Sequence, residues 1–438
     1  MATRKLSFYR ATILNPLNDK ECEFWKDGVL VTQKGSDGHH RILEIVEYHH
    51  ACEKYVEDFG ASNLYEFPGK LIIPSFFDMH FHWVQDDVRT MPKDSLLTWL
   101  EKYTFPAEHR FSSKSYAQRK AKVFFKKLLS TGTLGGACYS SIHEHALEAA
   151  MKEVKGDVLV GNVLMTMNSP DNLTQSPKEA QSLALKLMKK FKHRYVLTPR
   201  FAISTDPVTM KETSRFANKN KIFKQSHLSE TTSEIDFVMS LYKEKAGFKS
   251  VKNYTEIYHK VGMLGPRSLM GHAIHLSSKE LDLLKKTKTS LVHCPTSNAP
   301  HKELGLGSGL FDFKKVEQKK ISWALGSDIG GGPFLSMLDV MQSFVRQNKK
   351  AKKKNATYIK ALYRATLAGA EILGVDKKSG NLGKGKEANF IVIPLKDKRF
   401  KDAETCLFKL LSAEKKRVRF DDYVEATFYR GLQVFKRS

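Results

Sequence analysis

Phe77-Asp78-Met79-His80-Phe81-His82 comes shortly after the apolar run Leu71-Ile72-Ile73-Pro74, and the prediction of the fold works outward from this stretch. Side chains alternate between the two faces of a β-strand, so in a strand His80 and His82 point to the same side. Two imidazoles on one face are half of a divalent metal site, because neutral imidazole is a common ligand for zinc and similar ions. A lone His-x-His pair also arises among surface residues. The prediction therefore requires further ligands elsewhere in the chain.

Strand-like apolar runs alternate with longer amphipathic runs of helical period from Leu71 onward. Such alternation predicts a parallel sheet with helical crossovers, and the strands are about as many as a (β/α)8 barrel needs. The predicted strands are residues 72–77, 133–140, 158–165, 195–199, 222–227, 268–272, 290–293 and 321–325. The predicted helices are residues 115–129, 177–192, 207–220 and 277–286, and a helix over 358–373 would close the ring.

Both ends of the chain have a different pattern, with short alternating runs separated by turn residues. They include residues 28–32 and 41–46 near the start, and 390–393 and 424–431 after Gly374. Short strands of this kind predict that the two ends together build one small β-domain that flanks the barrel. The predicted domains are residues 1–70 and 376–438 for the two parts of the small β-domain, and residues 71–375 for the barrel.

Composition indicates an ordinary globular protein: 41% of the 438 residues are hydrophobic. No apolar run is long enough to cross a bilayer, and no apolar segment follows the charged start, so we predict neither a transmembrane helix nor a signal peptide. The cysteines are Cys22, Cys52, Cys138, Cys294 and Cys406. Their odd number and wide spacing argue against a disulfide framework and a cysteine-rich zinc module, and fit a reducing, cytoplasmic location.

A formal net charge of +25 is the strongest deviation in the composition. Such a field attracts nucleic acid or an anionic membrane surface. The lysines are nevertheless spread through predicted helices, which indicates solvated helix faces, and the densest cluster, residues 349–354, reads as an exposed loop or helix end. The charge leaves one rival class, a nucleic-acid-binding protein on an inactive barrel. The mark of that rival would be a missing ligand in the predicted metal site.

Further candidate ligands stand at the ends of later predicted strands, where barrel enzymes carry their catalytic groups. His227 ends one strand and Glu230 follows three residues later; His272 ends the next strand. Asp328 follows the last strand and precedes Gly330-Gly331-Gly332. Each alone is equally well explained as a cap or loop anchor. Together they put metal-ligand types on the first, fifth and eighth strands, with one more histidine on the sixth.

These residue types define a chemistry. The predicted metal ligands are His80, His82, His227 and Asp328, with one position left open for water. A catalytic metal of this kind lowers the pKa of its bound water toward ~7, so hydroxide is available at neutral pH. Glu230 is offset from the ligands and can move protons, Asp328 can also accept a proton from the water, and His272 can hydrogen-bond the water and stabilise a tetrahedral centre. This is equipment for hydrolytic attack on an electrophilic carbon.

These residues and several longer runs resemble the amidohydrolase superfamily, and within it the guanine deaminase family. The runs are WLEKYTFPAEHRF (residues 99–111), TPRF (198–201), SHLSE (226–230), HCPTSN (293–298) and GSDIGGG (326–332). The resemblance covers about residues 70–395; the terminal β segments match only in general character. It implies a hydrolase that acts on C–N bonds of cyclic amidines and converts guanine to xanthine and ammonia in purine catabolism, as a homodimer. No predicted ligand is missing, so a nucleic-acid partner is not expected, and the lack of a long apolar run predicts no membrane partner.

The resemblance also implies residue roles. One zinc ion per chain, with iron as the open alternative, would be held by the four ligands above, and Glu230, Asp328 and His272 would be catalytic. The implied guanine contacts are His82, Trp83, Val84, Gln85, Arg200, Phe201, His227, Glu230 and Asp328. By type, Gln85 offers a donor and an acceptor to a purine edge, Arg200 offers donors to a ring carbonyl, and Phe201 offers an apolar face. A related aminated heterocycle, such as an oxidised guanine or a pterin, is the alternative substrate.

Overall fold

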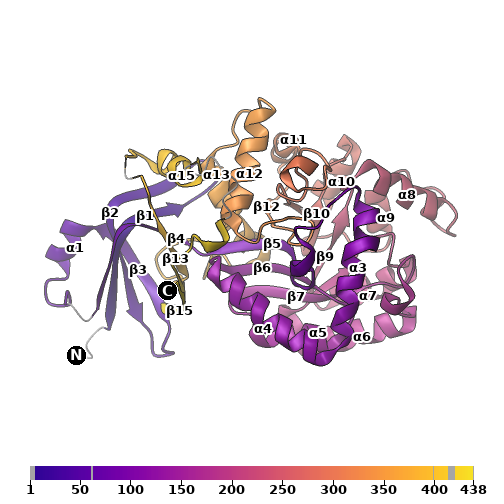
Figure 1. The fold of residues 1–438 in the computed structure, drawn as a ribbon, viewed down its shortest axis with the longest axis horizontal. Helices are drawn as coiled ribbons and strands as arrows, with labels where there is room; N and C mark the ends of the chain where they lie inside the picture. Colours follow the sequence, from indigo (N-terminus) through magenta and orange to yellow (C-terminus); the bar gives the residue numbers. More distant parts are fainter. Residues whose placement is uncertain (1–4, 61–62, 398, 413–419, 438) are drawn as a thin grey trace. The chain divides into compact units, whose positions relative to one another are not determined.

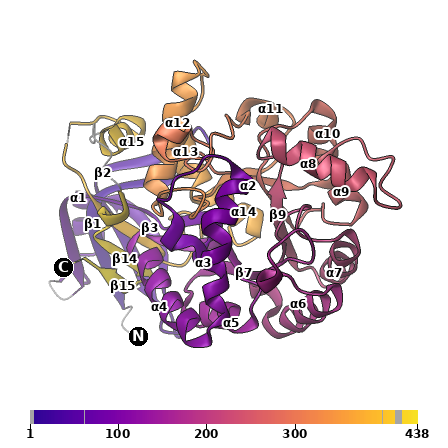
Figure 2. The same cartoon turned by 45° about the vertical axis from the view of Figure 1, so that its right-hand side comes forward.

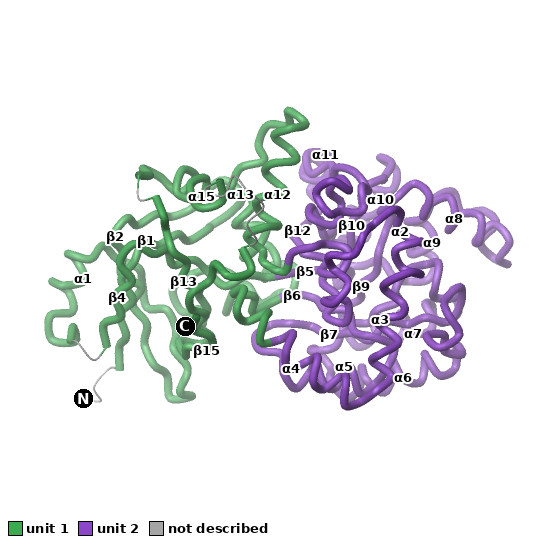
Figure 3. Tube along the Cα trace, viewed as in Figure 1, with its two compact units in different colours: residues 1–77, 126–135, 335–438 green, residues 78–125, 136–334 purple. Residues whose placement is uncertain are grey.

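The structure, a computed structural model, describes residues 5–60, 63–397, 399–412 and 420–437. The chain divides into two compact units, drawn in green and purple in Figure 3. Unit 1 comprises residues 1–77, 126–135 and 335–438, and unit 2 comprises residues 78–125 and 136–334. Every residue predicted to take part in catalysis, metal binding or substrate binding belongs to unit 2.

Eight strands follow one another around a nearly closed parallel barrel (Figure 1). They are β5 (Phe76–His82), β6 (Thr133–Ser140), β7 (Asp157–Leu164), β8 (Val196–Pro199), β9 (Phe223–Leu228), β10 (Ser268–His272), β11 (Ser290–His293) and β12 (Trp323–Leu325). Neighbouring strands from β7 to β12 pair in parallel. After β12, the backbone N–H of Asp328 donates to the carbonyl of His80 in β5 at 2.7 Å, which brings the last strand back to the first. The predicted (β/α)8 barrel is confirmed.

Helices lie around the outside of these strands (Figure 2). They include α4 (Lys114–Ser130), α5 (Glu144–Glu153), α6 (Pro177–Phe191), α7 (Pro207–Lys219), α8 (Thr232–Lys243), α9 (Tyr254–Lys260), α10 (Ser278–Thr287) and α11 (Phe313–Gln318). The first four predicted helices are found as α4, α6, α7 and α10. Three helices begin with a capping box, in which a Ser or Thr and a Glu three residues later satisfy each other's backbone N–H: Ser176 with Glu179, Thr231 with Glu234, and Ser277 with Glu280.

The prediction of a single strand over residues 72–77 is wrong, because these residues are divided between two sheets. Residues up to Pro74 belong to β4 (Leu64–Pro74), which pairs with β1 (Leu6–Pro16) and β13 (Phe390–Pro394). The barrel strand β5 begins only at Phe76. Proline has no backbone N–H to donate to a ladder, so β4 ends at Pro74 and the chain starts a new strand in the barrel.

Seven strands from both ends of the chain form a second sheet, as predicted. Their order is β15-β14-β13-β4-β1-β2-β3, with β2 (Cys22–Lys34), β3 (His40–Glu47), β14 (Ala426–Tyr429) and β15 (Leu432–Lys436) as its further strands. Its core includes the stacked rings of Phe390 and Phe428, whose centroids are 4.4 Å apart. The single strand predicted over 424–431 is in fact β14 followed by a turn, because Arg430 and Gly431 both adopt positive φ and form a tight hairpin connection to β15.

Unit 1 also contains the helix predicted over residues 358–373, which is two helices rather than one. They are α13 (Tyr358–Arg364) and α14 (Leu367–Leu373). The break lies at Thr366, whose φ of −135° is not helical and whose hydroxyl donates to the carbonyl of Leu362. The remaining α-helices of unit 1 are α1 (Tyr48–Lys54), α12 (Met337–Lys350) and α15 (Ala403–Ser412). Those of unit 2 are α2 (Leu96–Trp99) and α3 (Phe105–His109). No helix in the described part of the chain is long and apolar enough to span a bilayer.

Candidate active site

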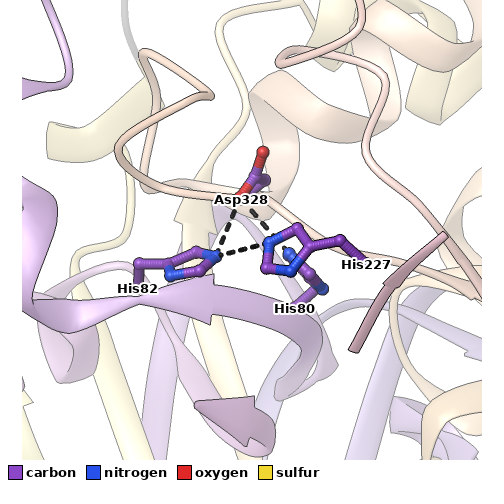
Figure 4. Close-up of side chains that lie close together, drawn as sticks. All are labelled: His80, His82, His227 and Asp328. Atoms are coloured by element: carbon purple, nitrogen blue, oxygen red, sulfur yellow. Dashed lines mark hydrogen bonds and ion pairs between the residues drawn. The ribbon is translucent and has the colours of Figure 1, made fainter. Parts of the chain in front are cut away.

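Four predicted metal ligands converge at the C-terminal ends of the barrel strands (Figure 4). They are His80 and His82 of β5, His227 of β9 and Asp328 after β12, and one ligand atom from each lies within 4.8 Å of all the others. Nε2 of His82 is 3.2 Å from Nε2 of His227, and Oδ1 of Asp328 is 3.3 Å from Nε2 of His80. The structure therefore brings the four predicted ligands together, and their binding of a metal ion stays a prediction.

The chemistry of these donors fits a divalent ion of the zinc type. Burial lowers the pKa of His80, His82 and His227, which leaves the three imidazoles neutral with a lone pair to offer. Nδ1 of His227 donates to the carbonyl of Arg200 at 2.6 Å, so its Nε2 is the unprotonated nitrogen and it faces the other ligands. Three imidazoles and one carboxylate are a donor set that zinc accepts, and a hydrogen bond from the second ring nitrogen is the usual support for such a ligand.

The segment that carries Asp328 is folded tightly against the barrel. Asp328 itself has a φ of 49°, in the left-handed region that non-glycine residues rarely adopt, and strain of this kind gathers at functional sites. A Cβ on Gly330 would lie 2.2 Å from Oε1 of Gln85, and one on Gly332 would lie 2.0 Å from the carbonyl oxygen of Ser327. The glycines after Asp328 are therefore required by close approach, and they let this segment pack beside Gln85.

Asp78 ties this segment to β5. Its carboxylate accepts the backbone N–H of Ser327 at 2.8 Å and also accepts the Ser327 hydroxyl. The N–H of His80 donates to the same carboxylate at 3.3 Å. Because Ser327 immediately precedes Asp328, one buried carboxylate sets the position of a ligand from β5 relative to the ligand that follows β12.

Glu230 is buried among polar groups beside the four ligands. Its Oε1 accepts the Ser308 hydroxyl at 2.9 Å and the Asn298 amide at 3.3 Å. Asn298 also donates to Nδ1 of His272 at 3.0 Å, so the proton of His272 is on Nε2. That nitrogen faces two carboxylates, at 3.5 Å from Oε2 of Glu230 and 3.8 Å from Oδ2 of Asp328.

Two carboxyl groups in this arrangement have pKa values moved in opposite directions. Burial, and then the charge of Asp328, raise the pKa of Glu230 to about 8. Burial also acts to raise the pKa of Asp328, but the imidazoles of His80 and His272 beside it outweigh burial and lower it. Near neutral pH, Glu230 therefore holds a proton while Asp328 is ionised, and such a separation is what acid and base roles require.

A cavity opens beside these groups and belongs wholly to unit 2. It is lined by His82, Gln85, Leu96, Trp99, Leu100, Arg200, Phe201, His227, Glu230, Glu234, His272, Leu306, Asp328 and Gly331. The lining combines charged, amide and imidazole groups with apolar and aromatic side chains, which is the usual character of a small-molecule site. Of the residues predicted to contact the substrate, seven line this cavity: His82, Gln85, Arg200, Phe201, His227, Glu230 and Asp328.

Two predicted contacts, Trp83 and Val84, are not among the lining side chains. Trp83 is buried and packs edge-to-face on Phe111, with ring centroids 4.9 Å apart, and also lies near Phe125. Its bulk is therefore accommodated by aromatic packing behind the strand end. A role for either residue in binding the substrate stays a prediction.

Among the residues that contact the predicted ones, Asn298, Ser308 and Glu108 had no role assigned from the sequence. Asn298 and Ser308 hold Glu230, and Glu108 contacts both Arg200 and Gln85. Glu108 and Asn298 do lie in runs that carry the family resemblance. The position of Glu108 among the aromatic residues of 99–111 could have marked it as a candidate functional residue. Ser308 lies between glycines in a loop, and no pattern in the sequence marks it.

Comparison with known proteins agrees with this geometry. A model of the amidohydrolase family matches residues 71–427. Guanine deaminase of Escherichia coli (strain K12) is 31% identical over 436 residues, which is 95% of this chain and 92% of that protein. Guanine deaminase of Homo sapiens is 32% identical over 340 residues, or 74% and 72% of the two chains. The chain belongs to the amidohydrolase family.

Within that family the chain is similar to the guanine deaminases, in fold as well as in sequence. The solved structure of E. coli guanine deaminase covers 99% of this chain with its whole length, at a TM-score of 0.85 and 28% identity. A guanine deaminase structure from C. acetobutylicum with guanine bound in its active site covers 98% of this chain with its whole length, at a TM-score of 0.84 and 27% identity.

Proposed function

We propose that this chain hydrolyses guanine to xanthine and ammonia, using one divalent metal ion, zinc by preference. The observation that carries the proposal is the convergence of His80, His82, His227 and Asp328 within 4.8 Å, next to a cavity that also presents Glu230. The similarity to guanine deaminases, one of them solved with guanine bound, supports the choice of substrate.

A divalent ion held by these four side chains would supply a Lewis acid and a water acidified toward a pKa of ~7. The Nε2–H of His272 faces both Glu230 and Asp328, so these three groups can orient a water molecule between them. Water adds to the carbon that bears the exocyclic amine of guanine. Glu230, protonated near neutral pH, gives its proton to the adjacent ring nitrogen, while Asp328 takes one proton from the attacking water. The Glu230 carboxylate then takes the proton of the newly formed hydroxyl group and gives it to the leaving amine, so ammonia departs and the ring carbon becomes a carbonyl. The proton on Asp328 afterwards returns to Glu230.

Binding of the base falls to the rest of the cavity. Arg200 supplies N–H donors for the ring carbonyl oxygen, Gln85 supplies an amide for the neighbouring ring edge, and Phe201 supplies an apolar face. Leu96, Trp99 and Leu306 complete the apolar part of the lining. A flat, nearly neutral heterocycle with one edge rich in hydrogen-bonding groups matches a lining that contains both polar and apolar side chains.

The test of the proposed mechanism is the variant Glu230→Gln. It keeps the size of the side chain but cannot carry the transferred proton, so we expect kcat for guanine to fall by about 100-fold or more while bound zinc stays at the wild-type level. The matched control is Glu280→Gln on α10, a buried carboxylate that hydrogen-bonds Thr255 and Ser277 away from the cavity. A near-normal kcat in Glu230→Gln would remove the proposed proton transfer.

Substrate range is tested in the same experiment with a panel that contains guanine, oxidised guanine, and an aminated pterin. We expect the highest kcat/KM for guanine. A clearly higher kcat/KM for another compound of the panel would support hydrolytic deamination but show that guanine is not the preferred substrate.

The proposal for the oligomeric state rests on the family resemblance, and the proposal for the cellular location rests on the number and spacing of the cysteines. We propose a homodimer in the cytoplasm. Light scattering after size-exclusion chromatography checks the first point, since a monomer mass would contradict it, and fractionation of the cells that produce the protein checks the second.

A further inference from the structure

Glu108 of α3 is a buried carboxylate behind the cavity, and it is not itself one of the lining residues. Both of its oxygens lie 2.8 Å from Nη1 of Arg200, and its Oε1 is also 2.8 Å from Nε2 of Gln85. The Arg200 guanidinium lies over the ring of Phe105, one helical turn before Glu108, at 5.3 Å from the ring centroid. One short helix thus holds the two polar side chains that face the base.

These contacts determine which atoms Gln85 and Arg200 have left to offer. A carboxylate only accepts hydrogen bonds, so the group of Gln85 that faces Glu108 is its NH₂ group, and the same nitrogen also lies 3.1 Å from Nδ1 of His82. The acceptor Oε1 is turned the other way, toward Gly330. Nη1 of Arg200 is occupied by Glu108, which leaves the donors on Nη2 and Nε. What remains is one acceptor on Gln85 and one group of donors on Arg200, and both residues line the cavity.

We propose that Glu108 is a positioning residue that sets the specificity of this site, by fixing the amide of Gln85 as an acceptor beside the donors of Arg200. The inference rests on the proposed guanine deamination and deepens it. Guanine presents a carbonyl oxygen next to a ring N–H on one edge, which is an acceptor followed by a donor. Donors from Arg200 and an acceptor from Gln85 are the complement of that edge.

Adenine presents the opposite order, an amine donor followed by a ring acceptor, so each of its groups would meet a group of its own kind. Buried polar groups left unpaired in this way discriminate strongly between otherwise similar ligands. Without the negative charge of Glu108, the Gln85 amide can rotate by half a turn and the guanidinium can move. The site would then accept either edge.

The test measures inhibition constants of hypoxanthine and adenine against guanine turnover. Hypoxanthine has the same carbonyl and N–H edge as guanine but no amine at the reacting carbon, so it reports binding alone. In wild-type protein we expect hypoxanthine to bind at least about 10-fold more tightly than adenine. In Glu108→Gln and Glu108→Ala this ratio falls by about 10-fold or more, while bound zinc stays unchanged. A glutamine at position 108 can face Gln85 with either end of its amide, so it does not restore the order.

Two comparisons separate positioning from a general loss of structure. Glu280→Gln is the matched control: it removes a buried carboxylate elsewhere in unit 2, and we expect it to leave the ratio unchanged. Glu108→Asp keeps the charge on a shorter side chain and should recover part of the ratio, which also serves if the other variants fold poorly. A ratio that stays at the wild-type value in these variants, with both constants raised equally, would overturn the inference.

The inference and the proposed function fail in different ways. If wild-type protein does not convert guanine, the binding constants are measured by direct calorimetric titration. If it then binds hypoxanthine better than adenine and this preference falls in Glu108→Gln, the proposed reaction is wrong and the role of Glu108 stands. If guanine is converted and the ratio does not depend on Glu108, the reaction stands and the role of Glu108 is wrong.

Discussion

Arg200 takes part in two functions through two different groups. Its backbone carbonyl accepts the Nδ1–H of His227 and so decides which nitrogen that histidine turns toward the other ligands. Its side chain lines the cavity and is held by Glu108. Arg200, immediately after β8, therefore sets the tautomer of a proposed metal ligand through its backbone and takes part in recognition of the base through its side chain.

Gly330 offers a test of the close packing around Gln85. Its φ is +115°, and a Cβ there would meet Oε1 of Gln85 at 2.2 Å, so Gly330→Ala must displace the Gln85 side chain. We expect KM for guanine to rise by about 10-fold, the cost of one misplaced hydrogen bond. The control is Gly247→Ala, at a φ of +80° with no atom within 4 Å, which adds backbone strain alone. Equal KM values in the two variants would contradict this explanation.

Lys224 of β9 gives a pH dependence that can be measured on stability. Burial lowers its pKa to about 8 from 10.5, and its ammonium donates to Asn218 and, at 2.9 Å, to the carbonyl of Gly262. Between these two pH values the unfolded chain holds the proton and the folded chain has lost it, so stability rises with pH. We expect wild-type protein to gain up to about 3 kcal/mol over Lys224→Met as pH rises from about 8 to 10.5. A constant difference in denaturant titrations across this range would show that burial does not act as stated.

The types and strand-end positions of the four ligands could be read from the sequence, and so could Glu230, because strand ends of a barrel converge by geometry. Glu108, Asn298 and Ser308 could not be assigned roles in the same way. The direction of their side chains depends on a π-helical turn (Leu100–Thr104) before α3, or on a loop. No rule of sequence spacing describes such contacts.

Elements cooperate through Asp78, which joins β5 to the segment after β12. Asp78→Ala removes the acceptor for both the N–H and the hydroxyl of Ser327, so the segment that bears Asp328 loses its anchor. We expect zinc affinity to fall by about 10-fold or more, measured by competition with a chelator. Asp78→Asn keeps one acceptor, so its zinc affinity should lie between that of Asp78→Ala and that of the wild-type protein. Wild-type zinc affinity in Asp78→Ala would show that the anchor is not needed.

Prediction from the sequence succeeded for elements with a long, regular pattern and failed where one pattern covers a change of partner. Residues 72–77 read as one apolar run, yet the chain leaves one sheet at Pro74 and enters another at Phe76. Apolar periodicity reports burial, and both halves are buried. Residues 358–373 and 424–431 failed for a similar reason, since the break at Thr366 and the turn at Arg430 depend on local backbone conformations that periodicity does not report. The domain boundaries at residues 70 and 375 stay a prediction.

For the whole molecule, the net charge of +25 raises the question of a polyanionic partner. The mark of an inactive barrel would be a missing ligand, and the four predicted ligands are all in place. Guanine is close to neutral, so a basic field does not steer it. We expect kcat/KM for guanine to change by less than about 2-fold between about 0.05 and 0.5 M salt, because screening affects only charged partners. A steep fall in kcat/KM with salt would show that the charge acts on the substrate.

Titration of metal-free protein with zinc, followed by xanthine formation from guanine, tests the central claim most directly. If the four converging side chains form one catalytic metal site, xanthine formation should be absent at the start, rise in proportion to added zinc and stop rising at one ion per chain. Full activity in the metal-free protein, or no xanthine at any zinc loading, would contradict the account.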